Sequence, residues 1–245
     1  MKKTVFITGA SRGIGAACAI YFAQHGYDVG INYLNNKEKA DEVADTIRSM
    51  GRSAYIYQGD VADFEQMKSV ITKCTNDLGH IDVVVNNAGI SQQKLFTDIT
   101  PQEWRKMFSV NVDGMYNVLQ AVLPSMINKK SGSIVNVSSM WGVYGASCEV
   151  HYSAAKSAVI GLTKALAQEL APSNIRVNCV APGLIDTEMN NNLSAEDLQG
   201  VIDEIPLGKI GTAEDVARAI YFLADDEHSS FTTGTVLNVN GGMVI

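Results

Sequence analysis

Tyr152 and Lys156 stand four residues apart in the run Tyr-Ser-Ala-Ala-Lys, and these two side chains could act together in proton transfer. The run is rich in alanine and continues with apolar residues at helical spacing, which predicts a helix over residues 151–171. Residues i and i+4 of a helix share a face, so a phenol would lie beside an ammonium. A cation ~4 Å away would lower the phenol pKa from its usual value near 10 by up to ~3 units at an effective dielectric of ~20. The pair therefore predicts an acid–base device, although two exposed neighbours would show the same spacing.

A glycine-rich stretch follows the first apolar run of the chain. Val5-Phe6-Ile7 leads into Thr-Gly-Ala-Ser-Arg-Gly-Ile-Gly over residues 8–15. Glycine permits a tight turn and lets main-chain N–H groups approach a pyrophosphate at a helix N-terminus. The spacing differs from the usual G-x-G-x-x-G, and an ordinary glycine-rich turn is the alternative. Its place directly after the first strand predicts a dinucleotide-binding turn.

The end of the second predicted strand indicates which dinucleotide would bind. An acidic residue there would hydrogen-bond the ribose 2′-hydroxyl of NAD and repel a 2′-phosphate. The strand instead ends in Asn32-Tyr33-Leu34-Asn35, without an acid. Arg12, inside the glycine-rich stretch, carries a guanidinium suited to phosphate recognition. The sequence therefore predicts NADP(H) rather than NAD(H).

Other polar residues end the later strands or interrupt an apolar run. Asn86-Asn87-Ala88-Gly89 ends the fourth strand at the carboxyl edge of the sheet, where open α/β folds bind ligands. Asn111 lies between two valines, which predicts a buried side chain that must find hydrogen-bond partners. Ser138 and Ser139 end the fifth strand, and either hydroxyl could donate to a carbonyl oxygen that is gaining charge.

Taken in chain order, these motifs resemble the short-chain dehydrogenase/reductase family from the first strand to the C-terminus. The resemblance implies an NADP-dependent oxidoreductase that reduces a ketone to an alcohol. It favours Ser139 over Ser138, because Ser139 stands thirteen residues before Tyr152. It implies that Asn111, Ser139, Tyr152 and Lys156 are catalytic, with Asn111 holding a water in a proton relay from Lys156. The cofactor contacts that it implies, besides Tyr152 and Lys156, are Gly9, Ser11, Arg12, Gly13, Ile14, Gly15, Asn32, Tyr33, Asp60, Val61, Asn87, Ala88, Gly89, Pro182, Gly183 and Thr187.

Strand-like and helix-like runs alternate along the chain, which predicts a doubly wound, Rossmann-like α/β fold with a seven-stranded parallel sheet. We expect a single domain over residues 1–245. The predicted strands are Thr4–Thr8, Asp28–Tyr33, Ala54–Gln58, Ile81–Asn86, Ser133–Ser138, Arg176–Ala181 and Val236–Val239. The predicted helices cover about residues 13–26, 37–50, 63–79, 101–128, 151–171 and 213–226. Thr100-Pro101-Gln102-Glu103 and Thr212-Ala213-Glu214-Asp215 have the composition of capping boxes.

Composition excludes several classes of protein. The chain has 245 residues, of which 46% are hydrophobic, and a net charge of −7, which argues against a nucleic-acid binder. No apolar run approaches the ~20 residues that span a bilayer. The four cysteines are scattered without a metal-ligand spacing, so we predict no metal site and a cytoplasmic location with reduced thiols.

The substrate is indicated only by resemblance. The C-terminal sequence is similar to the 3-oxoacyl-[acyl-carrier-protein] reductases of fatty-acid synthesis, which implies a carrier-bound substrate and a basic docking patch. Lys129 and Lys130 occupy one expected basic position, whereas Ser173 stands at a second and Arg176 is displaced from it. Residues 188–206 interrupt the strand–helix rhythm, and we expect this insertion to act as a substrate lid. A surface helical excursion would have the same pattern.

Other functions stay open, among them that of another short-chain ketone or alcohol oxidoreductase. The segment from Trp141 to Ser153 resembles reductases that act on the 5-aminopentanone-modified lysine of elongation factor P, where Glu149 could pair with the substrate ammonium. A nucleotide-binding protein without activity is the alternative from another class, and the complete set of predicted catalytic residues argues against it. The helix over residues 151–171 has an apolar face that a partner or the chain itself could cover, and the family resemblance implies a homotetramer paired through it.

Overall fold

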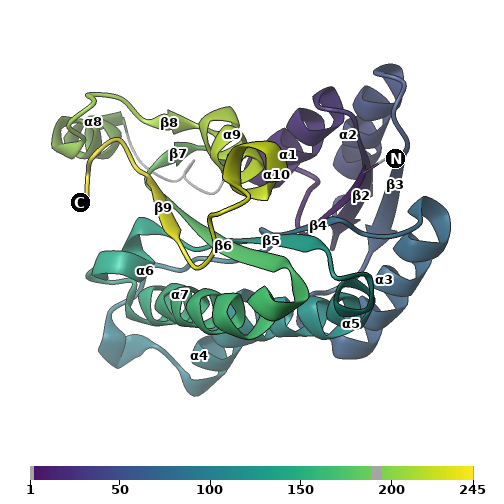
Figure 1. Cartoon of the computed structure of the whole chain (residues 1–245). Coiled ribbons are helices and arrows are strands. Elements are labelled where there is room, and N and C mark those ends of the chain that lie inside the picture. The colour runs from purple at the N-terminus through teal and green to yellow at the C-terminus, as the bar shows by residue number, and fades with distance from the viewer. Residues whose placement is uncertain (1–2, 189–194, 245) are drawn as a thin grey trace.

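The computed structural model describes residues 3–188 and 195–244, and a parallel sheet runs through its centre (Figure 1). The sheet has seven strands in the order β3-β2-β1-β4-β5-β6-β9, all parallel. The strands are β1 Lys3–Ile7, β2 Tyr27–Tyr33, β3 Ala54–Gln58, β4 Val83–Asn86, β5 Gly132–Val137, β6 Ile175–Pro182 and β9 Val236–Val239. The predicted doubly wound α/β fold is confirmed, with strand ends shifted by at most two residues.

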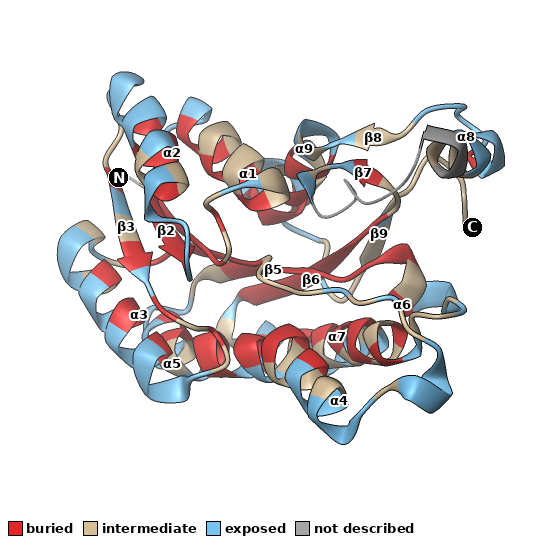
Figure 2. Cartoon of the chain, turned by 180° about the vertical axis from the view of Figure 1, so that it is seen from behind, coloured by how far each residue is buried: buried red, intermediate tan, exposed pale blue. Residues whose placement is uncertain are grey.

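Helices cover both faces of this sheet, as Figure 1 shows. Val5 and Ile7 of β1 pack into one hydrophobic cluster with α1, α2 and α9, whereas Phe6 of the same strand packs into a second cluster with α3, α5 and α7. The helices are α1 Gly13–Gln24, α2 Lys37–Ser49, α3 Phe64–Leu78, α4 Pro101–Phe108, α5 Gly114–Lys129, α6 Met140–Tyr144, α7 Val150–Leu170, α8 Ala195–Glu204, α9 Ala213–Ala224 and α10 Asp226–Ser229. The inner strands β1, β2, β4, β5 and β6 are buried on both sides, which explains their continuous Val/Ile runs, and the helices are buried mainly on their inner side (Figure 2).

The helices begin where the sequence provides caps. Thr100 and Thr212 each accept a hydrogen bond from the N3 amide of α4 and α9, and the acidic N3 side chains bond back to the threonine amides. Both predicted capping boxes are confirmed. α1 differs, because Arg12 at its N-cap makes no side-chain cap and its first turn holds no acid. Its first N–H groups therefore have no side-chain partner, as an anion-binding helix requires.

The predicted helix over residues 101–128 is interrupted. α4 ends at Phe108, a π-helical turn spans Ser109–Asp113, and α5 begins at Gly114. Such turns insert one residue into a helix and are frequent at functional sites. Apolar spacing did not reveal this turn, because both flanking helices keep an inward face. Asn111 lies at the middle of the π turn.

The strand order reverses between β1 and β4, and the carboxyl ends of the strands open there. β1 lies between β2 and β4, and the chain leaves these strands toward helices on opposite faces. Open α/β sheets bind ligands in the crevice at such a switch point. Near this edge a two-stranded sheet of β7 Ile185–Asp186 and β8 Gly211–Thr212, together with α6, adds structure that was not predicted. Residues 189–194 of the predicted lid lie outside the described residues, and α8 forms its second part.

Across the residues that the structure describes, no helix combines the length and the apolar character needed to cross a bilayer.

Candidate active site

A cavity of about 600 Å³ opens at the carboxyl ends of β4, β5 and β6. It brings together residues as far apart in the chain as Ile14 and Met243. All four predicted catalytic residues line it: Asn111, Ser139, Tyr152 and Lys156. Of the predicted cofactor contacts, its lining includes Ile14, Asn87, Gly89, Pro182, Gly183 and Thr187. A concave site of this size holds a small ligand, and the polar groups converge at one end of it.

The two serines after β5 have different surroundings. The Ser138 hydroxyl donates to the main-chain oxygen of Lys156 at 2.8 Å, so it ties β5 to α7. The Ser139 hydroxyl is the N-cap of α6 and accepts a hydrogen bond from the Trp141 amide at 3.2 Å. The hydroxyl also forms a hydrogen bond with Tyr152, which lowers the pKa of that phenol. The geometry therefore favours Ser139 over Ser138 as the group that faces a substrate.

Tyr152 and Lys156 share a face of α7, but their electrostatics differ from the sequence-based expectation. Burial raises the pKa of Tyr152 to about 12, while Ser139 opposes this rise and Glu149 adds to it. Burial also lowers the pKa of Lys156 to about 8. The predicted lowering of the Tyr152 pKa is therefore wrong for the protein without bound cofactor and substrate. Removal from water penalises both charged forms, and this effect exceeds the attraction between them.

The position of the ammonium explains why the attraction is small. Lys156 is 3% exposed, its Nζ donates to the main-chain oxygen of Val137 at 3.0 Å, and it lies 5.7 Å from the centre of the Tyr152 ring. At neutral pH the two pKa values leave the phenol protonated and the lysine charged. A protonated hydroxyl beside a cation is the arrangement that proton donation to a carbonyl oxygen requires.

Asn111 is completely buried and is held by the π turn. Its Nδ2 donates to the main-chain oxygens of Ile90 and Met107, both at 3.0 Å, and its Oδ1 accepts from the Ile90 amide at 3.3 Å. A Cβ atom added to Gly89 would lie 2.6 Å from the Asn111 side chain and 3.2 Å from Lys156 Nζ. Gly89 is therefore required for Asn111 and Lys156 to approach each other.

The glycine-rich loop packs directly on the segment after β4. Asn87 Nδ2 donates to the main-chain oxygens of Thr8 and Gly9, at 2.9 and 3.1 Å, and the Ala88 amide donates to the Thr8 hydroxyl at 3.0 Å. Gly9 has a φ of +62°, and a Cβ atom there would lie 3.0 Å from the Ala88 Cα. Asn87 and Ala88 thus position the loop, and Ser11, Gly13 and Gly15 belong to the turn that they hold.

The predicted cofactor contacts at the ends of β2 and β3 support neighbouring segments of the fold and do not line the cavity. Asn32 is 1% exposed, and its amide bonds to the main-chain oxygens of Tyr57 and Gly59 and to the Gly9 amide. Tyr33 is buried in the core. The side chains of Asn32 and Tyr33 are therefore occupied, and the structure does not bring them to the cavity. Asp60 and Val61 lie outside the cavity too; Asp60 Oδ1 accepts from the Ala62 amide and Val61 packs on Gly114.

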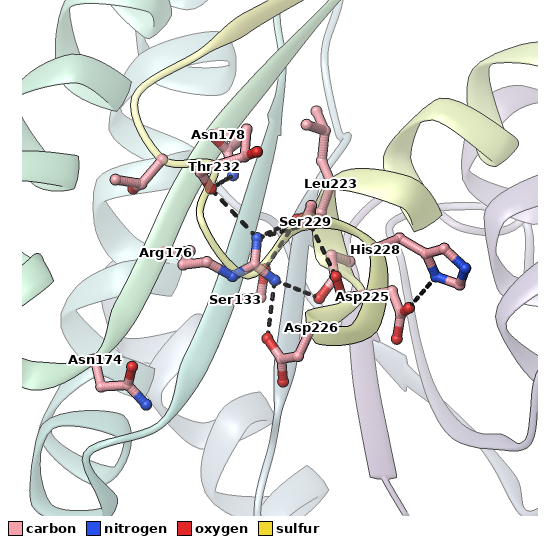
Figure 3. Close-up of polar contacts among 12 residues, drawn as sticks. Ser133, Asn174, Arg176, Asn178, Leu223, Asp225, Asp226, His228, Ser229 and Thr232 are labelled. Carbon is pink, nitrogen blue, oxygen red and sulfur yellow. Dashed lines mark hydrogen bonds and ion pairs between the residues drawn. The ribbon is translucent and has the colours of Figure 1, made fainter.

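Two of the basic residues weighed for carrier docking, Arg176 and Lys129, are engaged within the chain. Arg176 is 8% exposed, and Figure 3 shows its guanidinium directed at the end of α9. There it donates to the main-chain oxygens of Leu223 and Ala224 and to Asp226. Lys129 forms an ion pair with Asp82 at 2.9 Å. Arg176 therefore stabilises a helix C-terminus and is not available on the surface.

Several residues of the cavity were not predicted as site residues. They are Ser91, Gln92, Gln93, Val137, Met140, Trp141, Leu184, Ile185, Val201, Glu204 and Met243. The signal for the first three was present, because they follow the Asn-Ala-Gly segment at the carboxyl edge of β4. Gln92 is fixed there by His151 and Glu103, at 3.0 and 2.9 Å. Val201 and Glu204 belong to α8, whose place over the cavity depends on long-range packing.

Comparison with known proteins decides the family. The model of a protein family described as enoyl-(acyl carrier protein) reductase matches residues 9–244. The chain belongs to the short-chain dehydrogenase/reductase family. It is 41% identical to a 3-oxoacyl-[acyl-carrier-protein] reductase of Staphylococcus aureus over 243 residues, which cover 99% of this chain and 98% of the relative. A Thermotoga maritima protein of the same name is 43% identical over 243 residues, with the same two coverages.

A solved structure gives the same result in three dimensions. A 3-oxoacyl-[acyl-carrier protein] reductase from Brucella melitensis superimposes with a TM-score of 0.92 at 37% identity, covering 98% of this chain and 90% of that chain. The family resemblance read from the motifs is confirmed, and so is the predicted class of enzyme. This short-chain dehydrogenase/reductase is an oxidoreductase that acts on a ketone or alcohol group.

Proposed function

We propose that the protein reduces a 3-oxoacyl thioester with NADPH, as a 3-oxoacyl-[acyl-carrier-protein] reductase. The observation that carries this proposal is one cavity that joins the Ser139, Tyr152 and Lys156 side chains to the region beside the glycine loop. Full-length similarity to proteins of that name supports the choice of substrate. Reductases of this family use NADPH as cofactor.

The residues around the glycine loop suit NADPH. The first turn of α1 offers main-chain N–H groups without a side-chain cap or an acid, which favours a pyrophosphate. Arg12 at its N-cap provides a cation for the 2′-phosphate, and β2 ends without an acid. When bound, NADPH would supply the hydride, while the protein provides position and electrostatics. Pro182, Gly183 and Thr187 would contact the nicotinamide end, because they line the cavity after β6.

Each catalytic side chain then has a separate task. Ser139 donates a hydrogen bond to the carbonyl oxygen of the substrate and stabilises the charge that develops there. Tyr152, which is protonated at neutral pH, gives its proton to that oxygen. Lys156 stabilises the resulting phenolate and returns a proton to it, and it would contact the nicotinamide ribose when NADPH is bound. Asn111 keeps the π turn in shape and holds a water through which Lys156 can regain a proton from solvent.

The name of the matching family and the names of the relatives differ in the bond that is reduced. Reduction of an enoyl group requires a proton at carbon, whereas reduction of a 3-oxo group requires a proton at oxygen. Two hydroxyl groups that converge, those of Ser139 and Tyr152, suit a carbonyl oxygen. We therefore favour the 3-oxo substrate.

A second candidate is the reduction of the aminopentanone-modified lysine of elongation factor P, and one observation favours it. Glu149 lines the cavity beside Tyr152 and stands at the N-cap of α7 without making a cap. Burial raises the pKa of its carboxyl, and Gln93 contacts it at 3.4 Å. An ammonium on the substrate would be a suitable partner for this half-buried carboxylate. The engagement of Arg176 and Lys129 within the chain also weakens the case for an acidic carrier.

We also propose a homotetramer paired through α7. Ala155 and Val159 are covered by the chain itself, so the apolar surface left for a partner is smaller than the sequence indicated. Ala165 is exposed on the same helix, and Ala158 is half-buried. Light scattering after size exclusion would measure the mass directly, and a monomeric mass would exclude this assembly.

The deciding experiment is a steady-state assay of NADPH oxidation with four substrates. They are acetoacetyl-carrier protein, acetoacetyl-CoA, a crotonyl thioester and aminopentanone-modified elongation factor P. We expect the highest kcat/KM with an acetoacetyl thioester and no turnover of the crotonyl thioester. Glu149→Gln should leave the acetoacetyl reaction within about twofold, whereas a loss of about tenfold on the aminopentanone substrate alone would select the second candidate.

A further inference from the structure

Glu188 joins two cations beside the glycine loop. Its Oε2 accepts a hydrogen bond from Arg12 Nη1 at 2.8 Å, and its Oε1 contacts Lys39 Nζ. Arg12 is the N-cap of α1, Lys39 lies in the first turn of α2, and Glu188 follows β7. Three segments that are far apart in the sequence therefore meet at one carboxylate.

The place of this contact is informative. α2 follows β2, and the end of β2 is where a doubly wound fold receives the 2′ position of the adenosine ribose. Lys39 is 38% exposed in its side chain and Arg12 is 63% exposed, so both cations face solvent at that point. The Glu188 carboxylate, shared between two cations, resembles a phosphate bound at the same point, because both anions present several acceptor oxygens.

The segment that carries Glu188 also lies against the glycine loop. A Cβ atom added to Gly13 would come within 3.5 Å of the Thr187 side chain. Arg12 and Lys39 together hold the pKa of Glu188 below its usual value, Lys39 having the larger effect, so the carboxylate is charged at neutral pH. Two cations and one anion leave a net positive charge that favours a multiply charged phosphate over the carboxylate.

We propose that Lys39 is the second cation of the 2′-phosphate site and that Glu188 is an internal competitor for it, displaced from Arg12 and Lys39 when the phosphate binds. This inference rests on the proposed use of NADP(H). To that proposal the inference adds a residue outside the glycine-rich stretch, Lys39, that selects the cofactor. Binding of the phosphate would also release Glu188, which follows Thr187 in the chain. Thr187 itself lines the substrate cavity.

The test is equilibrium binding to the cofactor-free protein, measured by calorimetry. The probes are adenosine 2′,5′-bisphosphate and adenosine 5′-monophosphate, which differ only in the 2′-phosphate. Lys39→Gln should weaken the bisphosphate by about tenfold and leave the monophosphate within about twofold. Glu188→Gln should tighten the bisphosphate by about fivefold, and added salt should reduce both effects because the groups are exposed.

Lys37→Gln is the matched control. Lys37 is in the same turn of α2 but pairs with Asp41, so its loss should change neither affinity by more than about twofold. Equal weakening of both probes by Lys39→Gln would overturn the inference, and so would an unchanged or weaker bisphosphate affinity in Glu188→Gln. If the variants show the predicted differences in affinity but the enzyme reduces no ketone, only the proposed function is wrong. If the enzyme reduces a ketone but the variants bind both probes as the wild type does, only this inference is wrong.

Discussion

Replacement of Lys156 by methionine should change how the stability of the protein depends on pH. Burial lowers the pKa of Lys156 from 10.5 to about 8, and the side chain is 3% exposed, so solvent screening is small. A shift of this size corresponds to about 3 kcal/mol at ~1.36 kcal/mol per unit. In the unfolded chain Lys156 keeps its proton up to the ordinary pKa of 10.5, whereas in the folded protein it loses this proton at about 8. Between pH 8 and 10.5 the unfolded state therefore binds more protons, and this group makes the folded state more stable as pH rises.

Methionine keeps the length of the side chain and removes the charge. The free energy of unfolding of Lys156→Met, minus that of the wild type, should therefore fall by about 2 to 3 kcal/mol between about pH 7 and pH 10. Other titrating groups are shared and cancel in the difference. The lost hydrogen bond to Val137 shifts the difference at every pH and does not alter its slope. Cys179, which is coupled to Lys156, has a pKa raised by burial to about 11 and stays neutral over most of this range.

Urea denaturation followed by circular dichroism, at several pH values across this window, measures the difference. Parallel pH profiles for the two proteins would refute the reasoning, because they would mean that the folded protein does not lower the pKa of this lysine. A difference that grows with pH would contradict the sign. Lys164→Met, on an exposed position of the same helix, is the control and should show no pH-dependent difference.

Three further predictions follow from the site. Ser139→Ala should lower kcat for ketone reduction by about 100-fold, whereas Ser138→Ala should mainly lower the free energy of unfolding by about 1 kcal/mol, as steady-state kinetics and urea denaturation would show; a larger loss of kcat in Ser138→Ala than in Ser139→Ala would exchange the two assignments. Asn111→Leu should destabilise the protein by about 2 kcal/mol, because two buried main-chain oxygens lose their hydrogen-bond donor. An unchanged midpoint of urea denaturation would show that Asn111 does not stabilise the fold. kcat for reduction should fall as pH rises through about 8, where Lys156 loses its proton, and a rate that stays flat to about pH 10 would show that the charge is not needed.

Local patterns were sufficient for the architecture. Apolar strands, capping residues and the glycine-rich turn each depend on a few neighbouring residues, and the strand order follows from repeated crossover connections. The four catalytic candidates, found from spacing and family resemblance, all line one cavity. Their roles remain predictions until the variants are measured.

The parts that could not be predicted depend on contacts between distant segments. The expected lowering of the Tyr152 pKa was wrong because burial, which spacing does not reveal, penalises the phenolate. The π turn at Ser109–Asp113 leaves no mark in the apolar pattern. The side-chain amide of Asn32, which stays a predicted cofactor contact, bonds to the glycine loop and to β3, and the sequence did not reveal these bonds. The contact of Glu188 with Arg12 joins residues 176 positions apart.

The most direct test of the account compares NADPH oxidation by the wild type and Tyr152→Phe with an acetoacetyl thioester at about pH 7. Phenylalanine keeps the ring and removes only the hydroxyl group, whose proton would pass to the substrate. We predict that kcat falls by about 1,000-fold while NADPH binds with an unchanged Kd. A Tyr152→Phe enzyme that retains a kcat within about threefold of the wild type would contradict the central claim that this phenol donates the proton.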